Sequence, residues 1–245
     1  MRQILEITWA NLRSLPDRIG ASLVAVVGVA GVVAVLVAVL SMARGFEQTL
    51  ASGAAEENVV VLRSGSSSEL DSGLGGDQVR LIRQAPQLAR ASAEVYFMVD
   101  LLKKSTGTSA NVPFRGVSED ADELRGDFEL LEGRMFEPGR REIIVGAGAA
   151  DTFEGLAVGG VLELGSERWD VVGRFSAGGG AGSELWTDAA VMQAAYRRGN
   201  NYSVVFAELV DAAAFEAFRD DLTSDPRLSV LVQREADYRA GQTQA

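Results

Sequence analysis

The side chains available for chemistry in this chain are carboxylates, hydroxyls and basic groups, because its 245 residues include neither His nor Cys. This composition excludes Ser-His-Asp and Cys-His catalysis, His-ligated metal sites, disulfides, zinc fingers and iron–sulfur clusters. The acidic pairs Glu119/Asp120 and Asp220/Asp221 are neighbours in the sequence. Carboxylates that work together as acid and base must converge in space, which adjacency along the chain does not indicate. We therefore expect no catalytic residue, no metal site and no cofactor.

Two glycine-rich segments share the composition of phosphate-binding loops. Residues 146–148 (Gly-Ala-Gly) follow a strand-like run, but Asp151 stands where G-x-G-x-x-G needs its third glycine. The next predicted strand begins at Val161, too soon for a βαβ unit of about 30 residues. Residues 178–182 lack the Gly-Lys-Ser/Thr ending of a phosphate loop. Neither segment predicts a nucleotide site, and we interpret the second as a flexible loop.

The charged residues are unevenly distributed. The chain has a formal net charge of −11 and an isoelectric point near 4.6, which argues against a nucleic-acid partner, since that would need a basic face. No charged residue lies between positions 19 and 43, a run of 25 residues rich in Val, Ala, Leu and Gly. As a helix this run would be roughly 37 Å long, against about 30 Å for the hydrocarbon core of a bilayer. We predict a transmembrane helix over residues 19–43.

Two alternatives to a membrane anchor are a cleaved signal peptide, because residues 41–43 (Ser-Met-Ala) resemble a cleavage site, and a buried helix of a soluble protein. The run exceeds the ~7–15-residue apolar core of signal peptides, which favours a retained anchor. Arg2, Arg13 and Arg18 precede the run. This positive flank predicts a cytoplasmic N-terminus, with residues 44–245 outside.

Small residues recur at spacings of three and four along one face of the predicted span. Small side chains let helices approach closely in lipid, where packing drives association. We expect this face to pack against another membrane helix, although Ala and Gly are abundant throughout the chain. The stripe consists of Ala21, Ala25, Gly28, Gly31, Ala34, Ala38 and Ser41.

Residues 1–18 have the periodicity of an amphipathic helix lying in the headgroup layer, and Pro16 would end or kink it. A tryptophan on its apolar side is typical of membrane interfaces. A solvent-exposed leader with chance periodicity is the alternative. The residues expected to form this interfacial helix are Ile4, Leu5, Trp9, Leu12 and Arg13.

The remainder of the chain indicates a mixed α+β domain. Alternating and β-branched runs predict strands, and 3.6-residue spacing before Pro or turn residues predicts helices. The predicted strands cover residues 58–63, 93–103, 111–117, 142–145, 161–164, 168–173, 203–209 and 228–233. The predicted helices cover residues 77–84 and 212–222.

Several phrases in this region, in this order, resemble the periplasmic core domain of MacB/FtsX-type ABC transporter permeases. They are Phe114-Arg115-Gly116-Val117, Leu131-Glu132-Gly133-Arg134-Met135-Phe136, Glu142-Ile143-Ile144-Val145-Gly146, residues 156–164 (LAVGGVLEL) and Trp169-Asp170-Val171-Val172-Gly173. The resemblance covers roughly residues 1–235.

The resemblance implies a two-lobed extracytoplasmic domain over residues 44–236, followed by a polar tail at 237–245. A mixed α/β lobe would comprise residues 46–112 and 200–236, and an inserted β-rich lobe residues 113–199. It also implies a bacterial inner-membrane permease subunit that is not itself an enzyme. A separate cytoplasmic ABC ATPase would hydrolyse ATP and drive export or mechanotransmission through this domain.

Further partners follow from the same resemblance: the lipid bilayer, a second permease copy or related permease, and a periplasmic protein. Family permeases continue with three more spans, so the chain is expected to be a fragment without the FtsX-like C-terminal part. The alternative function is a single-span receptor, scaffold or assembly factor whose exported domain binds a protein.

Overall fold

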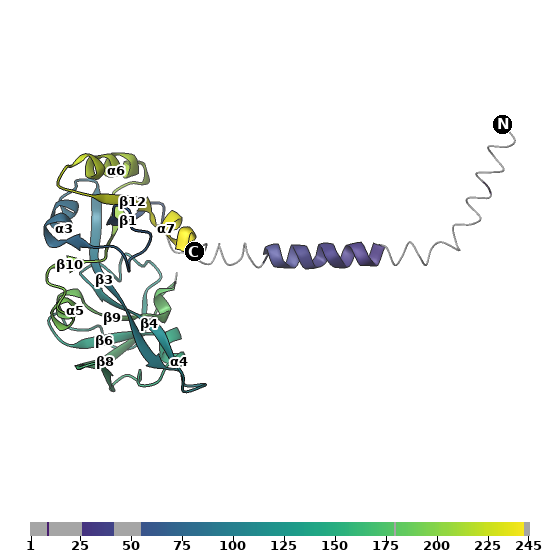
Figure 1. The fold of residues 1–245 in the computed structure, drawn as a ribbon, viewed down its shortest axis with the longest axis horizontal. Coiled ribbons are helices and arrows are strands. Elements are labelled where there is room, and N and C mark those ends of the chain that lie inside the picture. Colours follow the sequence, from purple (N-terminus) through teal and green to yellow (C-terminus); the bar gives the residue numbers. More distant parts are fainter. Residues whose placement is uncertain (1–8, 10–25, 42–54, 179, 243–245) are drawn as a thin grey trace. The chain divides into compact units, whose positions relative to one another are not determined.

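The computed structural model describes Trp9 and residues 26–41, 55–178 and 180–242 (Figure 1). The chain divides into two compact units, Met1–Gln48 and Thr49–Ala245.

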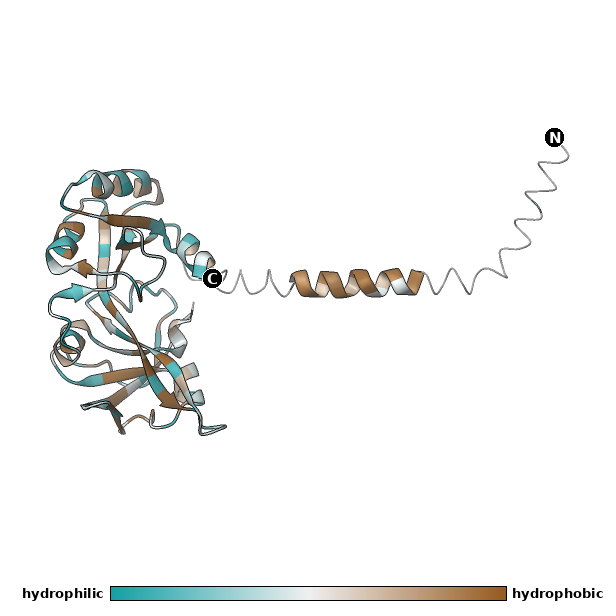
Figure 2. Cartoon of the chain, viewed as in Figure 1, coloured by the Kyte–Doolittle hydropathy of each residue, from teal (hydrophilic) through white to brown (hydrophobic). Residues whose placement is uncertain are grey.

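In the first unit, residues 26–41 form a helix whose side chains are exposed and mostly apolar (Figure 2). None of the helices within the described residues is long and apolar enough to cross a membrane. The predicted span 19–43 extends beyond the described residues at both ends and stays a prediction. Trp9 is 71% exposed.

The predicted sites of this unit fall partly outside the described residues. Ala21 and Ala25 of the small-residue stripe lie outside them, and so do the other four residues of the predicted interfacial helix. The remaining stripe residues lie on the described helix. They are Gly28, Gly31, Ala34, Ala38 and Ser41.

The second unit is built on a ten-stranded mixed sheet in the order β12-β1-β11-β3-β4-β9-β6-β8-β5, with β7 paired to β8. Most neighbours are antiparallel, while β4–β9 and β6–β8 are parallel. The strands are β1 Asn58–Arg63, β3 Leu88–Leu102, β4 Ser109–Val117, β5 Glu129–Gly133, β6 Glu142–Gly146, β7 Val161–Leu164, β8 Glu167–Ser176, β9 Leu185–Asp188, β11 Val204–Leu209 and β12 Val230–Arg234. A separate small sheet pairs β2 Leu74–Gly75 with β10 Asn201–Tyr202.

Helices cover both faces of the sheet. The α-helices are α3 Gly76–Arg83, α4 Ala147–Thr152, α5 Ala189–Ala195, α6 Phe215–Ser224 and α7 Glu235–Gln242, and the 3-10 helices are η1 Ala181–Ser183 and η2 Ala212–Ala214. Helices α3 and α6 pack against the β12-β1-β11 end of the sheet (Figure 1), where Ile82 and Phe218 are fully buried.

One face of the sheet carries two separate apolar cores, and strand β3 passes from one to the other. Ala93 belongs to the core under α3 and α6, whereas Val95 belongs to the core formed with β4, β6, β8 and α5. Successive side chains of a strand point to opposite faces. Glu94, between these two residues, therefore points to the other face of the sheet, which we call the pocket face.

The pocket face carries two smaller apolar clusters with charged residues between them. One cluster joins Val60 of β1 and Phe206 of β11 to Tyr238 of α7. The other joins Ile144 of β6 to Trp186 of β9. Strands β1 and β6 are thus buried on both faces, which explains their continuous apolar sequences.

The predicted α+β class is confirmed, and strands β1, β7 and β8 begin within one residue of the predicted positions. Strand β3 begins five residues before the predicted position 93. The lobe boundaries stay a prediction, because β4 runs across the proposed division at 112/113 within one continuous sheet. The predicted polar tail 237–245 is helical up to Gln242, and it buries Tyr238.

Candidate functional site

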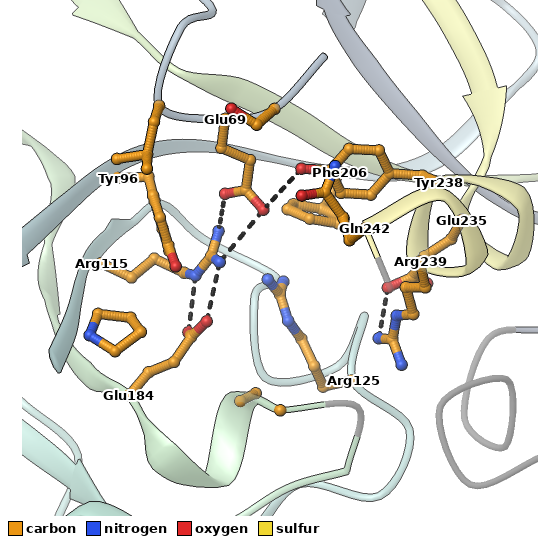
Figure 3. A pocket seen from close by; sticks show the side chains of 15 residues that line it. Glu69, Tyr96, Arg115, Arg125, Glu184, Phe206, Glu235, Tyr238, Arg239 and Gln242 are labelled. Atoms are coloured by element: carbon orange, nitrogen blue, oxygen red, sulfur yellow. Dashed lines mark hydrogen bonds and ion pairs between the residues drawn. The ribbon is translucent and has the colours of Figure 1, made fainter. Parts of the chain in front are cut away.

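A pocket of about 350 Å³ opens on the pocket face of the sheet, between α7 and the loops before β5 and β9 (Figure 3). Its floor is unusual because it consists of buried charged side chains. Arg115 of β4 and Arg125 of the loop after β4 are 4% and 6% exposed. The carboxylates beside them come from three segments far apart in the sequence, at Glu69, Glu94 and Glu184.

Arg115 lies at the centre of this cluster and contacts all three carboxylates. Its Nε and Nη2 donate to the two oxygens of Glu184 at 2.7 and 2.9 Å. Its Nη1 donates to Glu69 at 2.5 Å and to Glu94 at 2.8 Å. Only arginine presents donors in a planar fork that can reach several carboxylates at once.

Arg125 completes the coordination of Glu94. Its two terminal nitrogens donate to both oxygens of that carboxylate at 2.7 and 2.9 Å. Its guanidinium also lies 4.5 Å from the ring centroid of Phe206 and 5.2 Å from that of Trp186. A fully buried glutamate is tolerated here because two arginines share its charge.

Helix α7 closes one side of the pocket. The hydroxyl of Tyr238 lies 3.5 Å from Glu69 Oε1 (Figure 3). The side chain of Gln242 donates to the Ser67 carbonyl at 2.8 Å. Arg239 pairs with Glu235 of the same helix at 2.5 Å. The helix therefore holds the loop that carries Glu69.

Burial and charge act on these groups in different directions. Burial raises the pKa of the Glu69 carboxyl; Arg115 opposes this, while the charges of Glu184 and Glu94 add to it. Burial acts on Glu94 in the same way, but the charges of Arg125 and Arg115 hold its pKa below the usual value. Burial also raises the pKa of Tyr96, beside Arg115, to about 12.

The cluster forms ion pairs and hydrogen bonds but offers no arrangement for nucleophilic catalysis. Its carboxylates are held by arginines, and a buried arginine stays protonated. Within the described residues, no group of three or more acidic side chains is arranged to hold a metal ion.

The two glycine-rich segments singled out in the sequence lie against each other. A Cβ added at Gly146 would lie 2.2 Å from the Gly182 carbonyl oxygen, and one at Gly148 would lie 2.9 Å from Ser183 Oγ. The amide of Gly146 also donates to the Glu184 carbonyl at 2.8 Å. These glycines allow close packing of two backbones next to the pocket, which is a structural role.

Sequence reasoning missed the charged cluster. Arg115 is the one charged residue of strand β4, and Glu94 lies between the buried residues Ala93 and Val95 of β3. A charge at a buried strand position indicates a partner elsewhere. The partners themselves are 21 to 69 residues away, so the sequence offers no signal that pairs them.

Comparison with known proteins identifies the family of this domain. A family model described as the MacB-like periplasmic core domain matches residues 22–225. The chain belongs to this family. The resemblance drawn from the sequence phrases is thereby confirmed. No curated protein matches the chain.

Two solved structures share the fold of the MacB-like domain described above. The periplasmic region of MacB from Actinobacillus actinomycetemcomitans is 11% identical, with a TM-score of 0.59, and the match covers 79% of this chain and 95% of that one. The extracellular domain of the noncanonic ABC-type transporter YknZ from Gram-positive bacteria is 14% identical, with a TM-score of 0.56, and the match covers 72% and 99%.

Proposed function

We propose that this chain is a permease subunit, or a part of one, of an ABC transporter in the bacterial inner membrane. Residues 19–43 span the membrane once, with the N-terminus in the cytoplasm and residues 44–245 outside. A separate cytoplasmic ATPase hydrolyses ATP, and the extracytoplasmic domain passes the resulting movement on in export or mechanotransmission. The observation that carries the proposal is the family match over residues 22–225.

The geometry of the domain supports a role in passing on movement. Strand β1 pairs with β12, so that Val59 lies opposite Arg234. Asn58 donates to Glu235 at 2.9 Å, and Arg234 donates to the Glu56 carbonyl. The connections that precede β1 and follow β12 are therefore fastened together, and a pull on either one reaches the same end of the sheet.

The same family match supports a role for the N-terminal unit in contacts with the membrane and with other membrane proteins. The interfacial helix of residues 1–18 lies at the cytoplasmic surface, near the ATPase. The small-residue stripe packs against a second permease copy or a related permease. A periplasmic protein binds the exported domain.

The test is co-purification of the full chain with the cytoplasmic ATPase of the same cell, in mild detergent. We expect the ATPase to co-purify with the intact chain and to be lost when residues 2–14 are deleted. Recovery of the same ATPase without these residues would contradict the role of the leader. Failure of any ATPase to co-purify would favour the single-span receptor or scaffold instead.

A topology control tests whether the chain without residues 2–14 is still inserted in the membrane. The chain has no Cys, so Thr106→Cys, in the turn between β3 and β4, provides a single reactive thiol. It should react with a membrane-impermeant maleimide in intact cells in both the full and the deleted chain. Gln3→Cys should react only after the cells are opened, and the reverse pattern would overturn the orientation.

A further inference from the structure

The charged cluster beneath the pocket contains one more carboxylate than it has arginines. Arg115 and Arg125 supply two positive charges, whereas Glu69, Glu94 and Glu184 supply three negative ones. The side chains of all five are at most 10% exposed. The neighbouring pair of Glu235 and Arg239 on α7 is balanced in itself, so it leaves the surplus unchanged.

The surplus is located at Glu69. Glu94 accepts three hydrogen bonds from the two arginines at 2.7 to 2.9 Å. Glu184 accepts two from Arg115 at 2.7 and 2.9 Å and one from Trp186 at 2.8 Å.

Among the residues that the structure describes, Glu69 has one short contact, at its Oε2. Its Oε1 has Arg115 Nη2 at 3.3 Å and the Tyr238 hydroxyl at 3.5 Å. Both distances are at the long limit of hydrogen bonding. Glu69 Oε1 is therefore the least satisfied carboxylate oxygen of the cluster, and Glu69 lines the pocket.

A buried negative charge that is only partly compensated is expensive, which favours uptake of a proton or a cation. The pocket beside Glu69 has room for more than a proton, since about 350 Å³ is within the range of small-molecule sites. Its walls combine the charged side chains, among them Arg125 and Arg239, with a group of aromatic and apolar residues. The aromatic and apolar residues include Leu70, Tyr96, Pro113, Ala181, Phe206 and Tyr238.

We propose that this pocket binds a small organic cation, a primary amine or guanidinium on an apolar body, with its positive group against Glu69 Oε1. The added charge balances the cluster, and the aromatic walls receive the apolar body. This site goes beyond the proposed transport function and does not depend on it.

A proton competes with this ligand for the same carboxylate. The groups that face Glu69 are Arg115 on β4, Glu94 and Tyr96 on β3, Glu184 before β9, and Tyr238 on α7. Burial raises the pKa of Glu69, with Glu184 and Glu94 adding to the effect of burial against Arg115. Binding of the cation should therefore weaken as the pH falls and Glu69 takes up a proton.

The test is calorimetric titration of the full chain in detergent with 2-phenylethylamine and with its neutral analogue 2-phenylethanol. At neutral pH we expect the amine to bind at least about tenfold more tightly, the contribution of one charge-assisted hydrogen bond. Glu69→Gln should remove this preference and its dependence on pH. Glu132→Gln, an exposed glutamate on β5, is the matched control and should keep both.

Thermal unfolding of both variants shows whether they are folded. Equal binding of amine and alcohol to the natural chain would overturn the proposal, and so would an amine preference that survives Glu69→Gln in a folded variant. Proton uptake at Glu69 without detectable amine binding would overturn it as well.

Discussion

Replacing Arg115 by Met removes the central cation of the buried cluster while keeping a side chain of similar length. Three carboxylates then share the single charge of Arg125, and each of them is at most 10% exposed. Removing one partner of a buried ion pair costs about 3–5 kcal/mol. We expect a loss in this range, which is a large part of the ~5–15 kcal/mol that stabilises a typical domain.

The loss should depend on pH in a defined direction. In the variant the pKa values of the three carboxyls rise, so their ionisation opposes folding at neutral pH, and this cost disappears as the pH falls and they are protonated. In the natural chain, ionisation of Glu94 stabilises the folded state, because the pKa of Glu94 is held below its usual value. This stabilisation declines as the pH falls and Glu94 takes up a proton. The difference in free energy of unfolding between the natural chain and the Arg115→Met variant should therefore become smaller as the pH is lowered from about 7.5 to about 5.

The assay is urea unfolding of the full chain in detergent, followed by the fluorescence of the buried Trp169 and Trp186. Arg168→Met is the matched control, because Arg168 is 72% exposed and its Glu163 partner is 3.6 Å away. Exposed pairs contribute about 0–1 kcal/mol. An Arg115→Met variant that unfolds within 1 kcal/mol of the natural chain, or whose deficit is as large in acid as at neutral pH, would refute this reasoning.

Three further changes test other parts of the domain by the same unfolding assay. Gly146→Ala should cost about 1–3 kcal/mol because the new Cβ meets backbone, whereas Gly126→Ala, with open space around it, should change stability by less than about 0.5 kcal/mol. Glu142→Gln should cost about 1–2 kcal/mol above about pH 5 and progressively less toward pH 2. A hydrogen bond from Arg134 lowers the pKa of Glu142 to about 2. The stabilisation that the ionised carboxylate provides is therefore lost as the pH falls through that value. Phe218→Ala should cost about 3–5 kcal/mol, since Phe218 is the fully buried residue with which α6 packs on the sheet; a cost below about 1 kcal/mol would place it outside the core.

Much of the fold could be predicted wherever local sequence and burial agree. The run of residues 58–63 is β-branched and apolar, and it is buried on both faces as strand β1. The predicted strands 161–164 and 168–173 leave a short connection between them, and Gly165 there has the positive φ of 62° that a hairpin turn uses.

Other elements could not be predicted because their stability comes from distant contacts. Strand β9 is four residues long and forms only between β4 and β6. Helix α7 has a polar sequence, and Tyr238 is held by residues of β1 and β11. Local propensity is weak in both, so tertiary packing decides the structure.

The candidate site was the least accessible part for the same reason. Arg115 was visible in the sequence as part of a family phrase, with no role attached. Its three carboxylate partners come from a loop, a strand and the residue before another strand, and only the tertiary structure brings them together.

The pairing of β1 with β12 has a consequence for how such a domain can be built into larger chains. Because the first and last strands of the sheet pair antiparallel, the start of β1 lies beside the end of β12, where α7 begins. A unit with adjacent ends can be inserted into a short loop between two helices without forcing them apart. The same property makes this domain a suitable module for transplantation into a surface loop of an unrelated protein, where it would fold without straining its host.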